Sequence, residues 1–257
     1  MSASEHDTVV RKSFEQQVGI FAGDHSPFAR RPHSPLAWLE PLEPDMIVLD
    51  VACGAAHVAE QAAPRVRQVV GIDLTPALLE VGAERLREAG ITNVLLQEGN
   101  ATELPFLDAS FELVACRGAL HHFPHPERPI AEMARVCKPD GRVVVSDMVA
   151  TSAESREHFD EVHRYLDPSH ARTLLEAELA DLLGSAVGPI SYGETSDPLR
   201  IPVDHIMTDV ADRDAVTSAL QAELTGGDAT GFDPVLDGDE ILVSFTSTVV
   251  HATRSLA

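Results

Sequence analysis

The sequence predicts an α/β fold, in which a mostly parallel sheet carries helices on both faces. Short apolar runs alternate with helix-like stretches between residues 46 and 150, and strands covered on both faces are typically near-continuous apolar runs. The chain has 257 residues, of which 44% are hydrophobic and 23% charged. This composition is typical of a globular domain and not of a disordered or coiled-coil chain.

The first strand and helix define the repeating unit. Met46–Val51 is a short apolar run, a tight turn follows at Gly54, and an Ala-rich helical stretch begins near Ala55. The helix predicted at Pro76–Ala89 has Thr75 at its expected N-cap and a proline in its first turn. Further strands are predicted at Arg67–Ile72, Asn93–Gln97, Phe111–Cys116 and Arg142–Met148, with a helix at Glu127–Cys137.

The alternation changes after residue 150. Two consecutive helices, Ala153–Leu166 and His170–Leu183, are predicted to form a lid. A strand at Val187–Tyr192, a helix at Asp212–Leu224 and a strand at Glu240–Ala252 follow. The fold class is therefore a Rossmann-like seven-stranded, mostly parallel sheet, and we expect one antiparallel strand at its edge.

The N-terminal segment is predicted to be an amphipathic helix that contributes to the lid, because Phe14, Val18 and Phe21 are spaced to share one helix face. The expected organisation has four parts: an N-terminal lid segment (1–43), a cofactor-binding core (44–150), a helical insertion (151–184) and a completion of the sheet (185–257).

The charge balance restricts the partners. Lysine and arginine number 19, and aspartate and glutamate 41, so the formal net charge is −22. Such a charge repels nucleic acid and anionic membranes, and we therefore expect a small-molecule partner, no nucleic acid and no membrane, with a homodimer left open. The sequence has neither a membrane-spanning apolar run nor a signal peptide, which favours a cytoplasmic protein.

No metal site is expected. The three cysteines, Cys53, Cys116 and Cys137, form no C-x-x-C pair. Three histidines lie within residues 121–125, but no carboxylate or cysteine stands beside them at ligand spacing.

The ends of the first two strands indicate a nucleoside site. Small residues at Ala52, Gly54 and Ala56 let a ligand approach the backbone where a helix begins. Asp73 follows Gly54 by 19 residues, a separation at which a carboxylate can bind both hydroxyls of a ribose. Together these features predict an adenosine.

Two candidate cofactors contain adenosine, and a second carboxylate distinguishes between them. A nicotinamide dinucleotide needs G-x-G-x-x-G around its pyrophosphate, whereas this loop has only Gly54 and places Asp50 beside it. A carboxylate there repels a pyrophosphate and suits a ligand with an ammonium and a sulfonium group. S-adenosyl-L-methionine has both.

Five motifs in order carry a family resemblance. They are Val48–Gly54, Val70–Leu74, Gly99–Phe106, Phe111–Phe123 and Arg135–Gly141. The set resembles class I S-adenosylmethionine-dependent methyltransferases, in particular the branch of the ubiquinone and menaquinone C-methyltransferases. The resemblance implies that Asp50 and Gly54 line the methionine part and that Asp73 holds the ribose. It also implies contacts to adenine from Leu74, Asn100 and Ala101, with Arg117 beneath the sulfonium.

The sequence departs from the family at Ala56, and at Ala52, where glycine is usual or frequent. An added Cβ at Ala56 is expected to push the cofactor or tilt the following helix. It is also the feature that supports an alternative, in which the cofactor serves a lyase, a cyclase or a regulatory protein instead of methyl transfer. A nicotinamide-dependent oxidoreductase is the second alternative.

Methyl transfer needs an electron-rich acceptor, and a histidine is the natural base to remove its proton. His121 and His122 follow the fourth strand and are the candidate catalytic residues. The candidate acceptor contacts come from the lid segments: Phe21, His163, Tyr165 and His170. We therefore expect a methyltransferase that modifies carbon or oxygen of a small, cyclic or aromatic hydroxylated metabolite.

Overall fold

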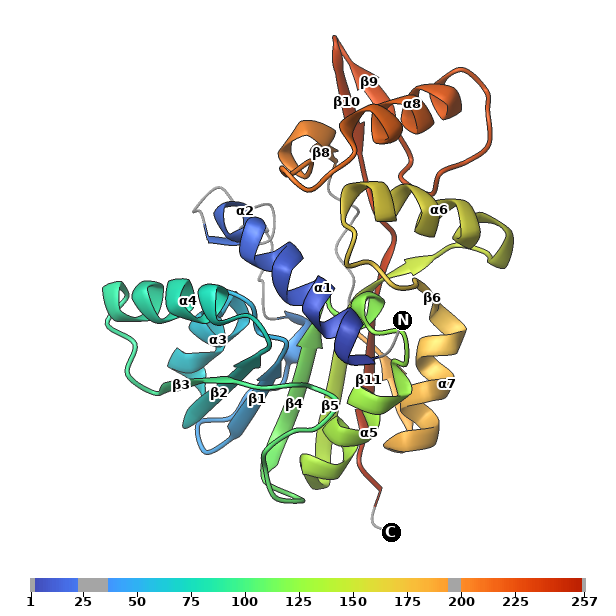
Figure 1. The fold of residues 1–257 in the computed structure, drawn as a ribbon. Coiled ribbons are helices and arrows are strands. Elements are labelled where there is room, and N and C mark those ends of the chain that lie inside the picture. The colour runs from blue at the N-terminus through green and yellow to red at the C-terminus, as the bar shows by residue number, and fades with distance from the viewer. Residues whose placement is uncertain (1–2, 23–36, 194–199, 256–257) are drawn as a thin grey trace.

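The computed structural model describes residues 3–22, 37–193 and 200–255. It has the predicted α/β architecture, with one large sheet between two layers of helices (Figure 1). Seven strands lie side by side in the order β3-β2-β1-β4-β5-β11-β7, and the short β6 pairs with the end of β5. These strands are β1 (Ile47–Val51), β2 (Gln68–Asp73), β3 (Val94–Glu98), β4 (Phe111–Arg117), β5 (Cys137–Ala150), β6 (Leu174–Leu175), β7 (Ile190–Tyr192) and β11 (Ser247–Thr253).

The direction of the strands fixes where a ligand binds. Strands β1 to β5 are parallel, and β11 is antiparallel to both β5 and β7. The expected antiparallel strand is present, but β11 lies between two strands and not at the edge. The strand order reverses between β1 and β4, and ligands of open α/β sheets bind beyond the carboxyl ends of the strands at such a point.

Two hydrophobic cores cover the two faces of the sheet, because successive side chains of a strand point to opposite faces. On β1, Leu49 belongs to one core and Val48 to the other. Helices α5 (Glu127–Val136) and α7 (Glu176–Ala186) pack into the first core, and α3 (His57–Ala62) and α4 (Pro76–Glu88) into the second. In the described residues, no helix has the length and apolar character needed to cross a membrane.

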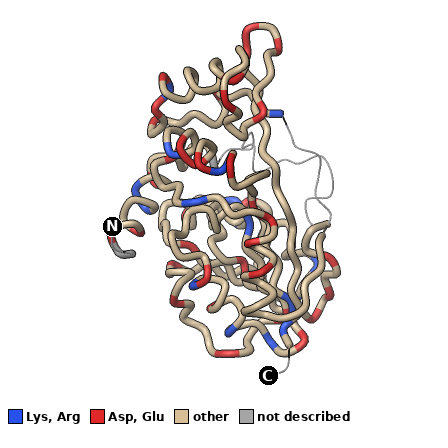
Figure 2. Tube along the Cα trace, turned by 90° about the vertical axis from the view of Figure 1, so that its right-hand side faces the viewer, with Lys and Arg blue, Asp and Glu red and all other residues tan. Residues whose placement is uncertain are grey.

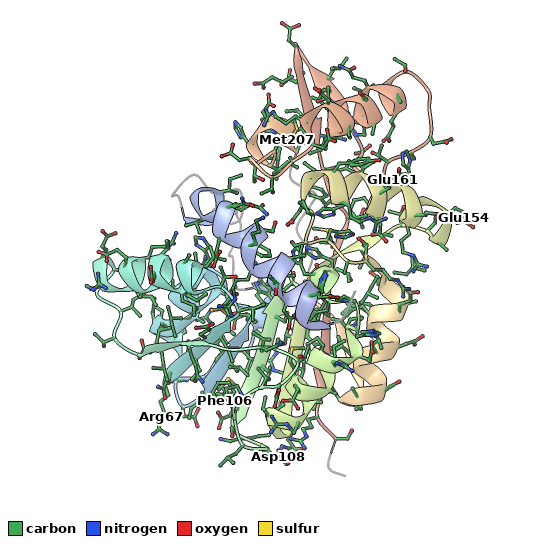
Figure 3. The ribbon with its side chains drawn as sticks, in the orientation of Figure 1. Arg67, Phe106, Asp108, Glu154, Glu161 and Met207 are labelled. Carbon is green, nitrogen blue, oxygen red and sulfur yellow. The ribbon has the colours of Figure 1, made fainter. Side chains whose placement is uncertain are left out.

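A smaller body stands above the carboxyl ends of the strands (Figure 1). It has its own core, to which α6 (Ala153–Leu166), α8 (Arg213–Leu224) and Phe232 contribute. Met207 belongs to this core and lies in the upper part of the molecule (Figure 3). A three-stranded sheet completes the body, formed by β8 (Ile201–Pro202), β10 (Glu240–Val243) and β9 (Val235–Asp237).

Two predicted elements differ from the structure. The helix expected at 170–183 begins only at Glu176, because the preceding backbone is tied down by other partners: Ala171 N–H donates to the carbonyl of His121, and Thr173 N–H to Asp160. The strand expected at 240–252 is interrupted at 244–246. Its first part, β10, belongs to the upper body, and its second part, β11, to the main sheet.

The N-terminal helix extends across the top of the main sheet (Figure 1). The predicted amphipathic helix is divided at Gln17 into α1 (Ala3–Gln16) and α2 (Val18–Ala22). Short 3₁₀ turns at Ala37–Leu39, Ala63–Arg65, Leu120–His122 and Val203–His205 complete the described elements.

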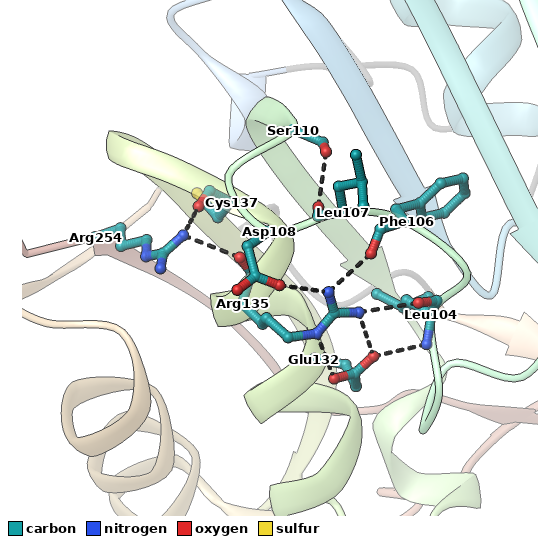
Figure 4. A network of polar contacts seen from close by, with 9 residues as sticks. All are labelled: Leu104, Phe106, Leu107, Asp108, Ser110, Glu132, Arg135, Cys137 and Arg254. Atoms are coloured by element: carbon teal, nitrogen blue, oxygen red, sulfur yellow. Dashed lines mark hydrogen bonds and ion pairs between the residues drawn. The ribbon is translucent and has the colours of Figure 1, made fainter.

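Arg135 of α5 holds the connection between β3 and β4 in place. Its guanidinium donates to the carbonyl oxygens of Leu104 and Phe106 at 2.9 and 2.8 Å, and it pairs with Glu132 and Asp108 (Figure 4). The hydrogen bonds to Glu132 and Asp108 raise the pKa of this already basic group. The fifth sequence motif, which begins at Arg135, therefore fixes the connection that follows Asn100 and Ala101.

Candidate active site

One cavity of about 690 Å³ lies at the carboxyl ends of the central strands. Its floor comes from the loops after β1, β2 and β4, and its cover comes from α1 and from the upper body. Of the predicted cofactor residues, all but one line this cavity: Asp50, Ala52, Gly54, Asp73, Leu74, Asn100, Ala101 and Arg117. The crevice predicted from the strand order is therefore present, and it continues into the lid.

The loop after β1 adopts an unusual backbone. Ala52, Gly54 and Ala56 have φ angles of 54°, 53° and 61°, in the left-handed region that favours glycine. The loop is tied to β2, since Gly54 N–H donates to Asp73 at 2.8 Å and Cys53 N–H to the carbonyl of Ile72 at 3.0 Å. The turn exposes the backbone of residues 52–55 to the cavity.

Ala56 is the predicted cofactor residue that does not line the cavity. It is 1% exposed, and its methyl group faces α4, where a Cβ at Gly82 would approach it to 3.0 Å. The extra methyl group of Ala56 therefore fills space between two helices and does not line the cavity.

Asp50 places a buried carboxylate on the cavity wall. It is 1% exposed, and its Oδ2 has no hydrogen-bond partner. Burial raises the pKa of Asp50 to about 7, although the positive charge of Arg117 opposes this shift. A buried acceptor without a donor is costly, so this atom fits a cationic ligand that reaches it through the cavity.

Asp73 is held rigidly at the end of β2. Its two carboxylate oxygens accept hydrogen bonds from the N–H groups of Gly54 and Thr75, each at 2.8 Å. Burial raises the pKa of Asp73, and these hydrogen bonds partly counteract it. Each carboxylate oxygen can accept a further bond, which is what two vicinal hydroxyls require.

Asn100 connects the cofactor end of the cavity to α1. Its side-chain Nδ2 donates to Asp7 at 3.0 Å, and its Oδ1 accepts from the backbone N–H of Thr102 at 2.9 Å. The amide is thereby fixed in orientation, with Ala101 and Leu74 beside it on the cavity wall.

The two candidate catalytic histidines have different surroundings. His121 Nδ1 lies 2.7 Å from Asp147 Oδ1, and Asp147 also accepts from the backbone N–H groups of Leu120 and Met148. Burial favours the neutral ring, but the charge and hydrogen bond of Asp147 outweigh it and raise the pKa of His121. An imidazole oriented by a carboxylate is the arrangement of a general base.

His122 is held as a neutral ring. Burial and the neighbouring His121 lower the pKa of His122 to about 3. Its Nδ1 is within 3.1 Å of Ser169 Oγ, and Phe14 of α1 contacts the ring edge to face with centroids 5.0 Å apart. His122 lines the cavity but is suited to packing more than to proton transfer.

Only some of the predicted acceptor residues line the cavity. His163 lines the cavity, and His170 lies behind it, with ring centroids 4.1 Å apart and planes 7° from parallel. Tyr165 lies outside the cavity lining. Its hydroxyl donates to Glu161 on the same helix, which is labelled on the upper body in Figure 3. The side chain of Phe21 lies outside the described residues.

Several cavity residues were not expected from the sequence. Asp147 is a charged residue inside the apolar run of β5, which was an available signal because buried carboxylates need partners. Asp7, Asp167, Ile206 and Phe245 carried no comparable signal, since they reach the cavity only through the tertiary arrangement of α1 and the upper body. Met148 lies on β5 beside Asp147.

Residues 42–190 match the protein family described as "Methyltransferase domain". The match covers more than half of the chain, so the chain belongs to this family and carries a class I S-adenosylmethionine-dependent methyltransferase domain. S-adenosyl-L-methionine is the cofactor that the family implies, and the nicotinamide-dependent alternative is thereby overturned.

Two curated proteins and one solved structure are similar to this chain. "Uncharacterized methyltransferase YcgJ" of Bacillus subtilis is 40% identical over 126 residues, which is 49% of this chain and 50% of that protein. A demethylmenaquinone methyltransferase of Listeria welshimeri is 37% identical over 126 residues, or 47% of this chain and 53% of that protein. The matched part thus spans about half the length of these curated relatives. The crystal structure of YcgJ is similar with a TM-score of 0.77 at 26% identity, covering 88% of this chain and 100% of that chain.

Proposed function

We propose that the protein transfers the methyl group of S-adenosyl-L-methionine to carbon or oxygen of a small, cyclic or aromatic hydroxylated metabolite. The observation that carries this proposal is the continuity of one cavity, which has Asp50 and Asp73 at one end and the His121–Asp147 pair at the other. A cofactor bound at the first end would direct its methyl group toward an acceptor at the second.

The cofactor end supports binding of a cationic adenosine compound. Asp50 Oδ2 lacks a donor inside the protein and would accept from the ammonium of the methionine part. Asp73 would accept the two ribose hydroxyls, and the segment from Gly99 to Ala101 with Leu74 would border the adenine. S-adenosyl-L-methionine supplies an electrophilic methyl group when bound, and the protein supplies alignment, which is worth about 7–11 kcal/mol in well-oriented reactions.

The acceptor end supports a hydroxylated ring. Apolar side chains that could pack against a ring line the cavity: Phe14, Trp38, Leu166, Ile206 and Phe245. Nε2 of His121 is the nitrogen not bonded to Asp147, and it would remove the proton of the acceptor hydroxyl. The printed name of the Listeria relative, a demethylmenaquinone methyltransferase, adds reduced naphthoquinones to the acceptors worth testing.

The test measures cofactor binding and product release separately, on protein treated with a chelator. We expect calorimetric binding of S-adenosyl-L-methionine, and release of S-adenosylhomocysteine only when a phenol, naphthol or reduced naphthoquinone is added. His121→Ala is expected to lower kcat by about 10²-fold or more, the usual contribution of a general base. The matched variant His122→Ala is expected to lose less than tenfold.

Two outcomes would contradict the proposal. Absence of cofactor binding removes the cofactor assignment. Tight cofactor binding without turnover on the whole acceptor panel instead favours the lyase, cyclase or regulatory alternative. Equal rates for wild type and His121→Ala would remove His121 as the base and leave the rest intact.

A further inference from the structure

A cluster of histidines is buried between the main sheet and the upper body. His121 comes from the turn after β4, His163 from α6 and His170 from the segment after α6. They are 5%, 8% and 3% exposed. One ring nitrogen of each lies within 4.8 Å of those of the other two. The function proposed above uses only His121. It does not explain why the other two rings lie beside His121.

The hydrogen bonds of the cluster leave its inner nitrogens without partners. His121 uses Nδ1 toward Asp147 at 2.7 Å, and His170 uses Nε2 toward Asp160 Oδ1 at 2.8 Å. The remaining Nδ1 of His170 is buried without a hydrogen-bond partner, as is Nδ1 of His163. Buried polar atoms without partners are uncommon and call for a ligand.

Two of the three rings are hydrogen-bonded to a carboxylate through one nitrogen, as histidines in metal sites are. Histidines that bind a metal almost always donate their second ring N–H to a carboxylate, a carbonyl or water, which fixes the ring and raises its basicity. Two of the three rings have this arrangement, with Asp147 behind His121 and Asp160 behind His170. Asp160 is itself oriented by the backbone N–H of Thr173 at 2.8 Å.

We propose that His121, His163 and His170 bind one divalent transition-metal ion, with an open coordination position that faces the acceptor end of the cavity. Three imidazoles suit zinc, iron, copper or nickel, and three protein ligands with a free fourth position are typical of catalytic zinc sites. His121 and His163 line the cavity, so the open position faces an acceptor oxygen. The sequence alone did not point to this site, because the proposed ligands come from separate segments of the chain.

Burial favours the neutral form that a metal requires in two of the three rings, His163 and His170, whereas Asp147 raises the pKa of His121. Desolvation lowers the pKa of His163 well below its ordinary value, and it also lowers the pKa of His170, where the hydrogen bond of Asp160 opposes the shift. Neutral imidazoles bind metals without first losing a proton. Zn–N bonds of about 2.0–2.1 Å place tetrahedral ligands about 3.4 Å apart, whereas the ring nitrogens lie within 4.8 Å of one another, so the rings need to approach by up to about 1.4 Å.

The metal site depends only on these side chains, whereas its use in acceptor binding rests on the proposed function. His121 Nε2 then has two states. It accepts the acceptor proton in metal-free protein, and it coordinates the ion in loaded protein.

The test titrates chelator-treated protein with Zn²⁺ by calorimetry and with Co²⁺ by visible absorption. We expect one ion per chain and the absorption of a low-coordinate cobalt site. His163→Ala and His170→Ala are each expected to weaken Zn²⁺ binding at least tenfold, and Asp160→Asn about 10–100-fold. His125→Ala is the matched control, because the side chain of His125 is 65% exposed, and it should retain wild-type affinity.

The metal site would be overturned if His163→Ala, His170→Ala and Asp160→Asn all bound Zn²⁺ as tightly as the control His125→Ala. Absence of saturable Zn²⁺ binding would overturn it as well. S-adenosyl-L-methionine affinity of each metal-free variant serves as the control for folding and should match the wild type. Methyl transfer together with a failure to bind added Zn²⁺ or Co²⁺ saturably would overturn only the metal site. Metal binding without any methyl transfer would sink only the proposed function.

Discussion

The carboxylate of Asp50 ends β1 in an environment that opposes its charge. It is fully enclosed by protein and has one oxygen without a donor. Folding raises its pKa from an ordinary 3.8 to about 7. A carboxyl whose pKa is raised by folding contributes stability that is fully present below its unfolded value of 3.8 and is lost progressively as the pH rises from there to about 7.

Asp50→Asn is therefore expected to stabilise the cofactor-free protein at pH 8, by up to about 4 kcal/mol. The gain should shrink below pH 7 and vanish near pH 4. Cofactor affinity should fall at the same time, because the amide cannot pair with an ammonium. Denaturant unfolding across pH 4–8 measures the first effect and calorimetry the second. The exposed Asp209 provides a control, Asp209→Asn. Equal stability of both variants at pH 8 would show that the buried charge of Asp50 does not destabilise the fold.

The residues that could be predicted are those set by local chain geometry. Asp50, Gly54 and Asp73 follow from their positions at the ends of two strands, and their places in the cavity needed no knowledge of the lid. Ala56 and Tyr165 were placed less well, because the direction of a side chain depends on which helix packs beside it. The pairing of His121 with Asp147 joins residues 26 apart in the sequence and was not foreseen.

At the scale of an element, α1 connects the two ends of the cavity. Near the cofactor end, Asp7 accepts from Asn100 and Arg11 pairs with Glu98 at 2.8 Å. Near the acceptor end, Ser13 donates to Asp167 at 2.8 Å. The helix therefore covers both ends of the cavity.

Phe14→Ala is expected to weaken the acceptor end alone. The ring contacts His122 and lines the cavity, and the loss of buried aromatic surface costs about 1.5–3 kcal/mol. We predict that kcat/KM for the acceptor falls about tenfold or more, while the dissociation constant of S-adenosyl-L-methionine changes less than twofold. Steady-state kinetics and calorimetry check this. Leu107→Ala, at a side chain outside the cavity that is 84% exposed, should change neither, and a matching loss of cofactor affinity in Phe14→Ala would contradict the separation.

The elements show why parts of the fold were harder to predict. Apolar runs identified β1 to β5, because their pattern is independent of their neighbours. The segment 170–175 has helix-compatible residues, yet its backbone binds His121 and Asp160. Such long-range hydrogen bonds override local propensity, and periodicity alone does not reveal them.

The whole molecule carries a net charge of −22, with acidic residues spread over both bodies and few basic ones among them (Figure 2). Like charges at this density repel and destabilise the compact state. Salt shortens the range of the repulsion from about 10 Å at 0.1 M to about 3 Å at 1 M.

We predict that Tm rises by about 2–8 °C between 20 mM and 1 M NaCl, which corresponds to about 1–2 kcal/mol in a chain of this size. Differential scanning calorimetry measures the change. KCl should act like NaCl if screening is the cause. A fall in Tm would mean that the surface ion pairs, such as Arg213–Asp204, outweigh the repulsion.

The position of β11 has a consequence for synthesis on the ribosome. β11 lies between β5 and β7 and follows the whole upper body in the chain. Strand β7 pairs only with β11 among the described strands, so it leaves the exit tunnel with no strand to pair with. The edge strand β7 therefore joins the main sheet only once β11, which is made after it, has paired with β5.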